Sequence, residues 1–187
     1  MSSVEMLEDI ESIKRLVDLD PNLETLPPGW SISDAMASQM KQAAQYALAE
    51  GFQRLESEPL DSSCQTVQVV INEFATSTVV LCVDRQTHRQ LTAPKVNVPE
   101  LWRSSQAEVT IDRTLAITDE EAAECRLEAE KVIRGDCLLL LEQTLSRPKF
   151  FEALLVGATF LATSTLKLAE DREDRAKEAL PLTVPIQ

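Results

Sequence analysis

Apolar and polar residues at the start of the chain follow the period of amphipathic helices. The apolar positions up to about Val17 recur at three- and four-residue steps, which places them on one face of a helix. Three prolines and a glycine within residues 20–32 prevent a helix from continuing there. Ser33 is suited to cap a second helix, which runs to about Glu58 and carries many alanines on its apolar side. Residues 1–61 are therefore predicted to form an N-terminal helical segment.

The hydrophobic period changes in the middle of the chain from that of a helix to that of β-strands. Thr66–Asn72 and Thr76–Asp84 are rich in β-branched residues, and apolar positions alternate in the second of them. A polar loop over Arg85–Pro94 follows, and Ala107–Ile117 is a third alternating stretch. The pattern predicts an antiparallel β insertion over residues 62–118.

Helical periodicity returns in the last third of the chain. Thr118 opens a T-x-x-E capping box, and its helix is expected to run to Leu145 with a break at Gly135. After a proline-containing turn, a long helix is expected to run to about Ala179. Residues 119–179 are therefore predicted to form a helical hairpin that packs with the N-terminal helices.

Two apolar stretches of this hairpin are expected to be buried. Cys137–Leu141 is apolar on all sides, which favours burial from several directions. Phe150–Leu168 is mostly apolar, but it contains the charged residues Glu152 and Lys167. A membrane-spanning helix needs about 20 predominantly apolar residues, so this stretch is a poor candidate for one. This composition favours a core helix, so no membrane span is predicted.

Residues 180–187 form a tail that carries no charged side chain and contains two prolines, which exclude a helix. Leu182, Val184 and Ile186 alternate along it, and an extended segment of this kind can add to a sheet edge or lie in a groove. Pro185 restricts it to an edge position. The three apolar side chains are candidate interaction residues, in contact with the same chain or a neighbour; the alternative is a frayed tail.

Together these elements predict an α+β protein. It is a mainly helical bundle of two N-terminal and two C-terminal helices, with a central antiparallel β insertion and an extended C-terminal tail. This order of elements looks similar to that of the small head-to-tail adaptor proteins of tailed phages. The resemblance covers the chain through the order of elements alone, and it implies a role as a virion component.

Charge separates the same three blocks. The 187 residues include 31 acids and 18 bases, which gives a formal net charge of −13. The first block has a net charge of −8, the β insertion zero and the remainder −5. An acidic chain with only 4% aromatic residues lacks the clustered bases and stacking side chains of general nucleic-acid binders. General nucleic-acid binding is therefore not expected, and the acidic helical surfaces are expected to stay in solvent.

The sequence contains few parts from which a catalytic or metal site could be built. His88 is the only histidine, the four glycines are isolated, and no two cysteines have CxxC spacing. Carboxylates are abundant, but neither an EF-hand loop nor a Glu-x-x-His motif is present. We therefore predict no catalytic residue, no metal and no cofactor. The cysteines are expected to be free thiols, and they are Cys64, Cys82, Cys125 and Cys137.

Two tryptophans and three basic loop residues are candidate contacts for a partner protein. Trp30 lies in the proline-bounded loop and Trp102 follows the second predicted strand, and tryptophan is a frequent interface anchor. Burial in the protein's own core is the alternative for both. Arg85, His88 and Arg89 concentrate positive charge in the neutral block, where they could contact phosphate or an acidic partner. The alternative for these three is a solvated turn.

These features favour a non-enzymatic structural or assembly protein that acts as a subunit of a homo-oligomeric complex with other protein subunits. The phage resemblance makes a head-to-tail adaptor one version of this role. The alternative is a cytosolic adaptor or regulatory protein that binds another protein through the tail or the proline-rich loop. A small enzyme that uses carboxylates or a cysteine is a third class. The first residues do not form a secretory signal, which favours the cytoplasm, or the virion if the source is viral.

Overall fold

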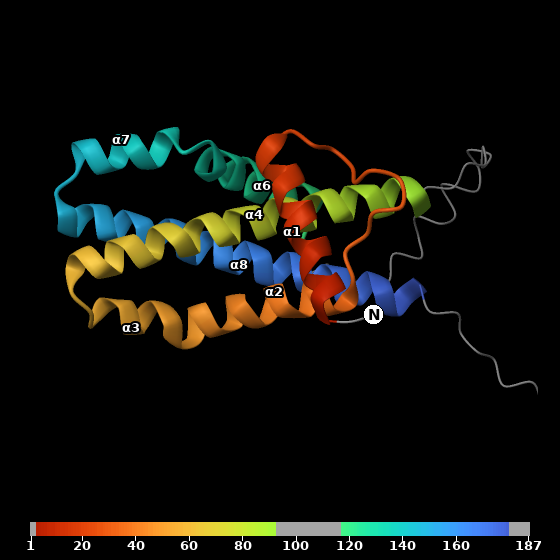
Figure 1. The fold of residues 1–187 in the computed structure, drawn as a ribbon, viewed down its shortest axis with the longest axis horizontal. Helices are drawn as coiled ribbons and strands as arrows, with labels where there is room; N and C mark the ends of the chain where they lie inside the picture. Colours follow the sequence, from red (N-terminus) through yellow and green to blue (C-terminus); the bar gives the residue numbers. More distant parts are fainter. Residues whose placement is uncertain (1–2, 93–116, 180–187) are drawn as a thin grey trace, which may run out of the picture.

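The computed structural model describes residues 3–92 and 117–179, and within these ranges the chain is helical with no β-strand. Two helices of 33 residues each, α4 (Leu60–Thr92) and α8 (Arg147–Ala179), run side by side in the same direction (Figure 1). Each is about 50 Å long. This central pair sets the length of the bundle.

Shorter helices flank the central pair and run in the opposite direction (Figure 1). α2 (Asp34–Tyr46) continues through a π-helical turn, η1 (Ala47–Gly51), into α3 (Phe52–Glu56), which leads into α4. α6 (Asp119–Arg134) and α7 (Asp136–Thr144) lead in the same way into α8. We refer to the helices from α2 to α4 as the first hairpin and to those from α6 to α8 as the second hairpin.

α1 (Ser3–Leu19) lies obliquely across the first hairpin (Figure 1). It packs against α4, and its residues Ile13 and Val17 are buried in the core. The loop that follows contributes Leu26 and Ile32 to the same core. Residues 3–32 therefore cover one side of the first hairpin.

The helix starts expected at Ser33 and Thr118 are confirmed. Met36 N–H donates to Ser33 Oγ and Glu121 N–H donates to Thr118 Oγ1, both at 3.2 Å. Each cap N–H donates in return, to Met36 Sδ (3.4 Å) in the first box and to Glu121 Oε2 (3.0 Å) in the second. The expected break at Gly135 is also confirmed: its φ of 79° is left-handed, which favours glycine at the end of a helix.

The two hairpins contact each other reciprocally, as the halves of a twofold-symmetric dimer do. α2 of the first hairpin packs against α8 of the second, and α6 of the second packs against α4 of the first. Between the long helices, Thr78 Oγ1 lies 3.2 Å from Thr165 Oγ1, and both residues are buried. Thr78 Oγ1 also lies 3.4 Å from the carbonyl oxygen of Leu161, and Thr165 Oγ1 lies 3.4 Å from that of Phe74. An approximate twofold axis therefore relates the hairpins.

These reciprocal contacts coincide with a repeat in the sequence. Equivalent residues of α4 and α8 are 87 positions apart, as in the Thr78–Thr165 pair. Residues 75–85 and 162–172 both begin with Ala-Thr-Ser-Thr, share a leucine and end with Asp-Arg. Residues 32–34 and 117–119 also agree, as Ile-Ser-Asp and Ile-Thr-Asp, and both isoleucines are buried. The protein is therefore built from two similar helical hairpins.

The predicted β insertion over residues 62–118 is wrong, because Thr66–Asn72 and Thr76–Asp84 belong to α4. Residues 74–83 are all buried by neighbouring helices, so their polar residues, Thr76, Ser77 and Thr78, do not mark a solvent-facing side and no helical period can be recognised. A β-branched residue in a helix costs only about 0.5 kcal/mol. Burying a valine side chain stabilises the fold by about 1.5 kcal/mol or more, so tertiary burial decides in favour of the helix.

Further expectations for this region change with it. The predicted polar loop is helical as far as Thr92, and residues 107–116 of the third predicted strand lie outside the described ranges. Ile117 is buried at the entrance to α6. The described fold is therefore helical and not α+β. The similarity to phage head-to-tail adaptors depended on the β insertion and loses its basis.

Candidate functional site

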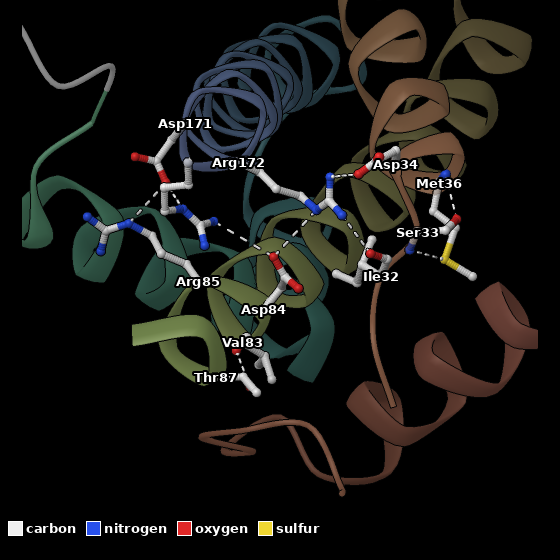
Figure 2. A network of polar contacts seen from close by, with 11 residues as sticks. Ile32, Ser33, Asp34, Met36, Val83, Asp84, Arg85, Thr87, Asp171 and Arg172 are labelled. Atoms are coloured by element: carbon white, nitrogen blue, oxygen red, sulfur yellow. Dashed lines mark hydrogen bonds and ion pairs between the residues drawn. The ribbon is translucent and has the colours of Figure 1, made fainter. Parts of the chain in front are cut away.

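An ion-pair cluster joins the two long helices near their C-terminal ends (Figure 2). Each helix contributes the repeated Asp-Arg dipeptide, and each arginine faces the aspartate of the other helix. Arg85 Nε lies 3.4 Å from Asp171 Oδ2, and Arg172 Nε lies 3.6 Å from Asp84 Oδ2. The four side chains are only 7–16% exposed. The cluster therefore follows the approximate twofold relation between the hairpins.

Each arginine of the cluster also pairs with the first residue of a shorter helix. Arg172 Nη1 lies 2.8 Å from Asp34 Oδ1 of α2, and Arg85 Nη2 lies 2.7 Å from Asp119 Oδ1 of α6. Asp34 is 89% exposed and Asp119 is 51% exposed. Carboxylates at these positions also interact favourably with the positive ends of α2 and α6. Each arginine consequently ties three helices together.

The predicted basic residues Arg85, His88 and Arg89 lie on the last turns of α4 and not in a loop. Arg85 is buried in the cluster, and Arg89 pairs with Asp119. His88 is half-buried, and the residue 87 positions later on α8 is Arg175. The expectation of a protruding basic loop is therefore wrong, because the last turns of α4 direct these side chains against α6 and α8.

Arg175, whose counterpart in the first hairpin is His88, bridges the two aspartates of the repeated dipeptides, Asp84 and Asp171. Its Nε lies 3.0 Å from Asp171 Oδ2 and its Nη2 lies 3.7 Å from Asp84 Oδ2. Burial raises the pKa of Asp84, although Arg172 and Arg175 oppose that shift. Hydrogen bonds from Arg89 and then Arg85 lower the pKa of Asp119. Burial thus disfavours the ionised form of Asp84, whereas hydrogen bonds from two arginines favour the ionised form of Asp119.

The cluster serves to fix the arrangement of helices. Within residues 3–92 and 117–179, no buried side-chain nitrogen or oxygen lacks a hydrogen-bond partner. In the same ranges, no group of three or more His, Cys, Asp or Glu side chains is placed to hold a metal ion. The charges of the cluster are engaged with one another, which is the arrangement expected of a structural tie.

The proline-bounded loop is held against the helices by main-chain hydrogen bonds. Leu26 N–H donates to Thr87 Oγ1 (2.9 Å), and Arg172 Nη2 donates to the carbonyl oxygen of Ile32 (2.7 Å). Arg126 of α6 donates to the carbonyl oxygen of Leu23. The loop that we expected to offer a contact surface is therefore anchored to α4, α6 and α8.

The predicted contact residues Trp30 and His88 come together beside this loop. They line a cavity of about 230 Å³ that Asp84, Arg172 and Arg175 also border. Trp30 remains partly exposed at its edge. The structure therefore joins two sequence-predicted residues in one small hollow next to the ion-pair cluster.

A larger, apolar hollow lies between α2–η1–α3 and α4. Its volume is about 610 Å³, within the range of sites that bind ligands or side chains of a partner. Lys14 of α1 borders one end, and Glu58 borders the other. We call this hollow the α2–α4 groove. Its large apolar lining residues are Met36, Met40, Phe52, Leu55, Val70 and Phe74.

A second apolar surface lies on α7. The expectation that Cys137–Leu141 is buried from several sides is wrong, because α7 contains no buried residue. Leu138 and Leu141 pack partly against the core, whereas Leu139 and Leu140 are 55% and 61% exposed. Helices in the described part of the chain cover α7 on one side only.

The four cysteines are free thiols in the structure, and Cys137 alone is partly exposed. Burial raises the pKa of Cys82 to about 12, with the neighbouring Cys125 acting in the same direction. Burial also raises the pKa of Cys64. These two thiols stay protonated at neutral pH, and a protonated thiol is a poor nucleophile.

Four predicted interaction residues, Trp102, Leu182, Val184 and Ile186, lie outside the described residues. The α2–α4 groove and the exposed leucines of α7 were not anticipated as sites. The groove has no local motif, since its walls come from helices that are distant in sequence. The Ala-Thr-Ser-Thr and Asp-Arg repeats were the signal that could have located the ion-pair cluster, because residues shared by both halves meet at the axis.

Two described segments are long and apolar enough to cross a membrane by length and composition, Leu60–Arg89 and Arg147–Lys177. Their most apolar windows are 67% and 44% buried within the protein. The core helices of soluble proteins satisfy the same criterion, so the absence of a membrane span stays a prediction.

Comparisons with known proteins found no match to this chain. No protein-family model, no curated protein and no solved structure matches it.

Proposed function

We propose that this protein is a non-enzymatic subunit of a homo-oligomeric assembly. The observation that carries the proposal is the pair of exposed leucines on α7. Leu139 and Leu140 are adjacent in sequence and lie on the side of α7 that faces away from the described core. Covering half-exposed leucines by a second protomer would contribute about 2 kcal/mol for the pair.

The neighbouring helix α8 supports the same proposal. Val156 and Phe160 are one helical turn apart, and they are 72% and 43% exposed. Large apolar side chains that remain in solvent on two consecutive helices are typical of protein-binding surfaces. α7 itself contains only two charged side chains, Asp136 and Glu142, so little charge would have to be buried.

The distribution of acidic residues favours association through one specific surface over non-specific aggregation. Glu120, Glu121, Glu124 and Glu128 are exposed on α6, next to α7 in the chain. Like charges on separate protomers repel at short range, and this repulsion disfavours contacts that do not match the apolar surface. Assembly would then depend on the leucines and on the geometry with which they meet.

The test is molecular mass by light scattering over a range of protein concentrations. We expect the mass to rise above the 20.8 kDa of one chain as the concentration increases. The double variant Leu139→Gln/Leu140→Gln should stay monomeric under the same conditions. The control Leu19→Gln removes an isolated leucine that is 84% exposed at the end of α1, and it should assemble as the wild type does.

A wild-type mass of 20.8 kDa at every concentration would overturn the proposal, and a double variant that assembles normally would exclude α7 as the contact. Removing residues 180–187 in the same assay tests the sequence-based expectation for the tail. Loss of assembly in that truncated chain, with normal assembly of the double leucine variant, would assign the contact to the tail and not to α7.

A further inference from the structure

The α2–α4 groove has the length of a short helical segment. Its lining extends from Met36 on α2 through η1 and α3 to Glu58, and from Thr66 to Ser77 on α4. The α4 wall covers about 16 Å of helix. A helix of three turns has the same length, and it presents apolar side chains at positions i, i+3 or i+4, and i+7 along one face.

The side chains of the groove suit an apolar helix face. Met36, Met40 and Phe74 are buried in its floor, whereas Ala43 and Tyr46 are exposed at its edge. The small Ala43 permits close approach of another backbone. Methionines adapt their shape to different apolar partners because their side chains are unbranched and flexible.

The second hairpin shows that this groove is not an inevitable result of the fold. Met36 corresponds to Glu121, since each is the third residue after its helix cap. Ala43 corresponds in the same way to Glu128, and both glutamates are exposed. The same backbone arrangement therefore carries an apolar surface in one hairpin and an acidic surface in the other. The apolar groove is a property of the side chains of the first hairpin.

Carboxylates outnumber cations at the end of the groove that α1 borders. Lys14 Nζ lies 2.9 Å from Glu73 Oε2 and 4.0 Å from Glu11 Oε1, so its charge is already neutralised. Asp18 lies one turn further along α1. Burial raises the pKa of Asp18, and the nearby carboxylate of Glu73 adds to the shift. A cation from outside would relieve this repulsion.

The opposite end of the groove has the same imbalance. Arg54 is the cation there, and its Nη2 lies 3.4 Å from Glu50 Oε2 while its guanidinium stacks over Tyr46. Glu56 and Glu58 are exposed close by on the same segment. The groove is thus an apolar channel with excess negative charge at both ends.

We propose that the α2–α4 groove binds an amphipathic helix of a partner protein, with large apolar side chains on one face over three turns and Lys or Arg at both ends. Charge complementarity selects this occupant, because basic ends meet the carboxylates around Lys14 and Arg54. A second copy of this chain fits less well, because its apolar helix α7 carries two acids and no base, and the exposed face of α6 is acidic. The proposal goes beyond assembly through α7, which lies along the other edge of the molecule (Figure 1).

The test is isothermal titration calorimetry of the full-length protein with three synthetic peptides of about 14 residues. The first has leucines at helical i, i+3, i+4 and i+7 spacing and lysines elsewhere. The second has glutamates in place of the lysines, and the third has the composition of the first with the leucines scrambled. We expect the first peptide to bind at least about tenfold more tightly than either of the others.

A matched pair of variants locates the binding site. Ala43→Trp fills the groove from an exposed position, and Ala49→Trp places the same side chain at an exposed position of the same helical segment outside the groove. Ala43→Trp should weaken binding of the lysine peptide by about tenfold or more, and Ala49→Trp should change it by less than about twofold. Far-ultraviolet circular dichroism verifies that both variants keep their helices.

The variant Glu58→Gln/Glu73→Gln tests whether the carboxylates at the ends of the groove attract the basic peptide. Glu152→Gln on α8 is the control. The double variant should lower the affinity for the lysine peptide and flatten its dependence on salt, because charge attraction between exposed groups is screened. The control should change neither. Leu139→Gln/Leu140→Gln should also bind the peptide normally, so that failure of the assembly proposal does not affect this one.

Each of the following results would overturn the proposal. The lysine peptide does not bind, the glutamate or scrambled peptide binds equally well, or Ala43→Trp binds as tightly as the wild type. Ala43→Trp that instead lowers the mass of the protein in solution would assign the groove to a second copy. Binding of an apolar dye that no peptide displaces would assign it to a small apolar ligand.

Discussion

The two hairpins have the same backbone plan and opposite outer surfaces. Each consists of a capped, interrupted helix followed by a helix of 33 residues. The side chains that they share, Thr78 with Thr165 and the two Asp-Arg dipeptides, lie where the hairpins meet. The outer surfaces differ: the first hairpin has an apolar groove, and the second has acids and exposed leucines. The comparison separates the residues that join the halves from those available to partners.

α1 adds to the difference between the hairpins. Its Lys14 pairs with Glu73 on α4, and the position 87 residues later on α8 is Phe160. Phe160 is exposed, and no helix in the described ranges lies across α8 as α1 lies across α4. A charged contact on one hairpin thus has an apolar, uncovered counterpart on the other.

The inner aspartates of the cluster provide the strongest test of the shared interface. Asp171→Ala should lower the free energy of unfolding by about 3 kcal/mol, because buried guanidinium groups lose a partner. Asp84→Ala should cost somewhat less, since burial already disfavours its carboxylate. Urea unfolding followed by circular dichroism measures both. The exposed partners supply the controls: Asp34→Ala and Asp119→Ala should each cost less than about 1 kcal/mol.

Giving α8 the side chain that α4 has at the equivalent position should destabilise the protein where the two long helices pack closely. α4 has Val70 where α8 has Gly157, and a Cβ at Gly157 would lie 2.9 Å from Ile71 Cδ1. Gly157→Val should therefore lower the free energy of unfolding by about 2 kcal/mol, because it overpacks the contact between the long helices. Val156→Ala at the next, exposed position should change it by less than about 0.5 kcal/mol. An unchanged stability for Gly157→Val would mean that the Ile71 side chain adopts another rotamer to make room.

The paired threonines test whether the approximate symmetry extends to energetics. Thr78→Val and Thr165→Val should each destabilise the protein by about 1 kcal/mol, since each leaves the other hydroxyl with fewer partners in the core. The double variant should cost less than the sum, because no unpaired hydroxyl remains. Urea unfolding of the four proteins gives the interaction energy. Strictly additive effects, or a large effect for one threonine alone, would contradict the reciprocal arrangement.

The smallest expected effect is an opposite pH dependence for two aspartates. The pKa of Asp84 is raised above 3.8, so the folded protein binds a proton there more readily than the unfolded chain. Its contribution to stability is greatest at low pH and is lost as the pH rises through the folded-state pKa. The pKa of Asp119 is lowered below 3.8, so its contribution is present above that value and is lost as the pH falls.

Urea unfolding of Asp84→Asn and Asp119→Asn at several pH values between about 3 and 6 distinguishes the two. The stability advantage of the wild type over Asp84→Asn should decrease as the pH rises above 3.8. Its advantage over Asp119→Asn should decrease as the pH falls below 3.8. Parallel slopes for the two variants would show that the aspartates occupy similar environments.

The elements at both ends of the chain could be predicted from sequence because their signals are local. Ser33, Thr118 and Gly135 act through contacts within a few residues, and the structure has all three in the expected roles. α4 could not be predicted in this way. Its residues 74–83 are buried by helices that are distant in sequence, and neither β-branched content nor period reveals which partners surround them.

The candidate sites were harder to predict than the helices for a related reason. The sequence predicts Arg85 as a charged loop residue, because its partners, Asp119 and Asp171, are far away along the chain. Leu139 and Leu140 read as core residues because an apolar run does not indicate whether neighbours exist to cover it. Hydrophobicity predicts a preference for burial, and only the tertiary arrangement determines whether the protein itself satisfies it.

The π-helical turn at Ala47–Gly51 has a consequence for how the groove could arise or be lost. Phe52 N–H bonds to the carbonyl oxygen of Ala47, one residue further back than in an α-helix, so the turn amounts to a single-residue insertion. Deleting one residue there would rotate everything beyond it by about 100°. Phe52 and Leu55 would leave the groove wall together. Deletion of a single codon in this turn would therefore be enough to convert the open groove into an ordinary helical surface.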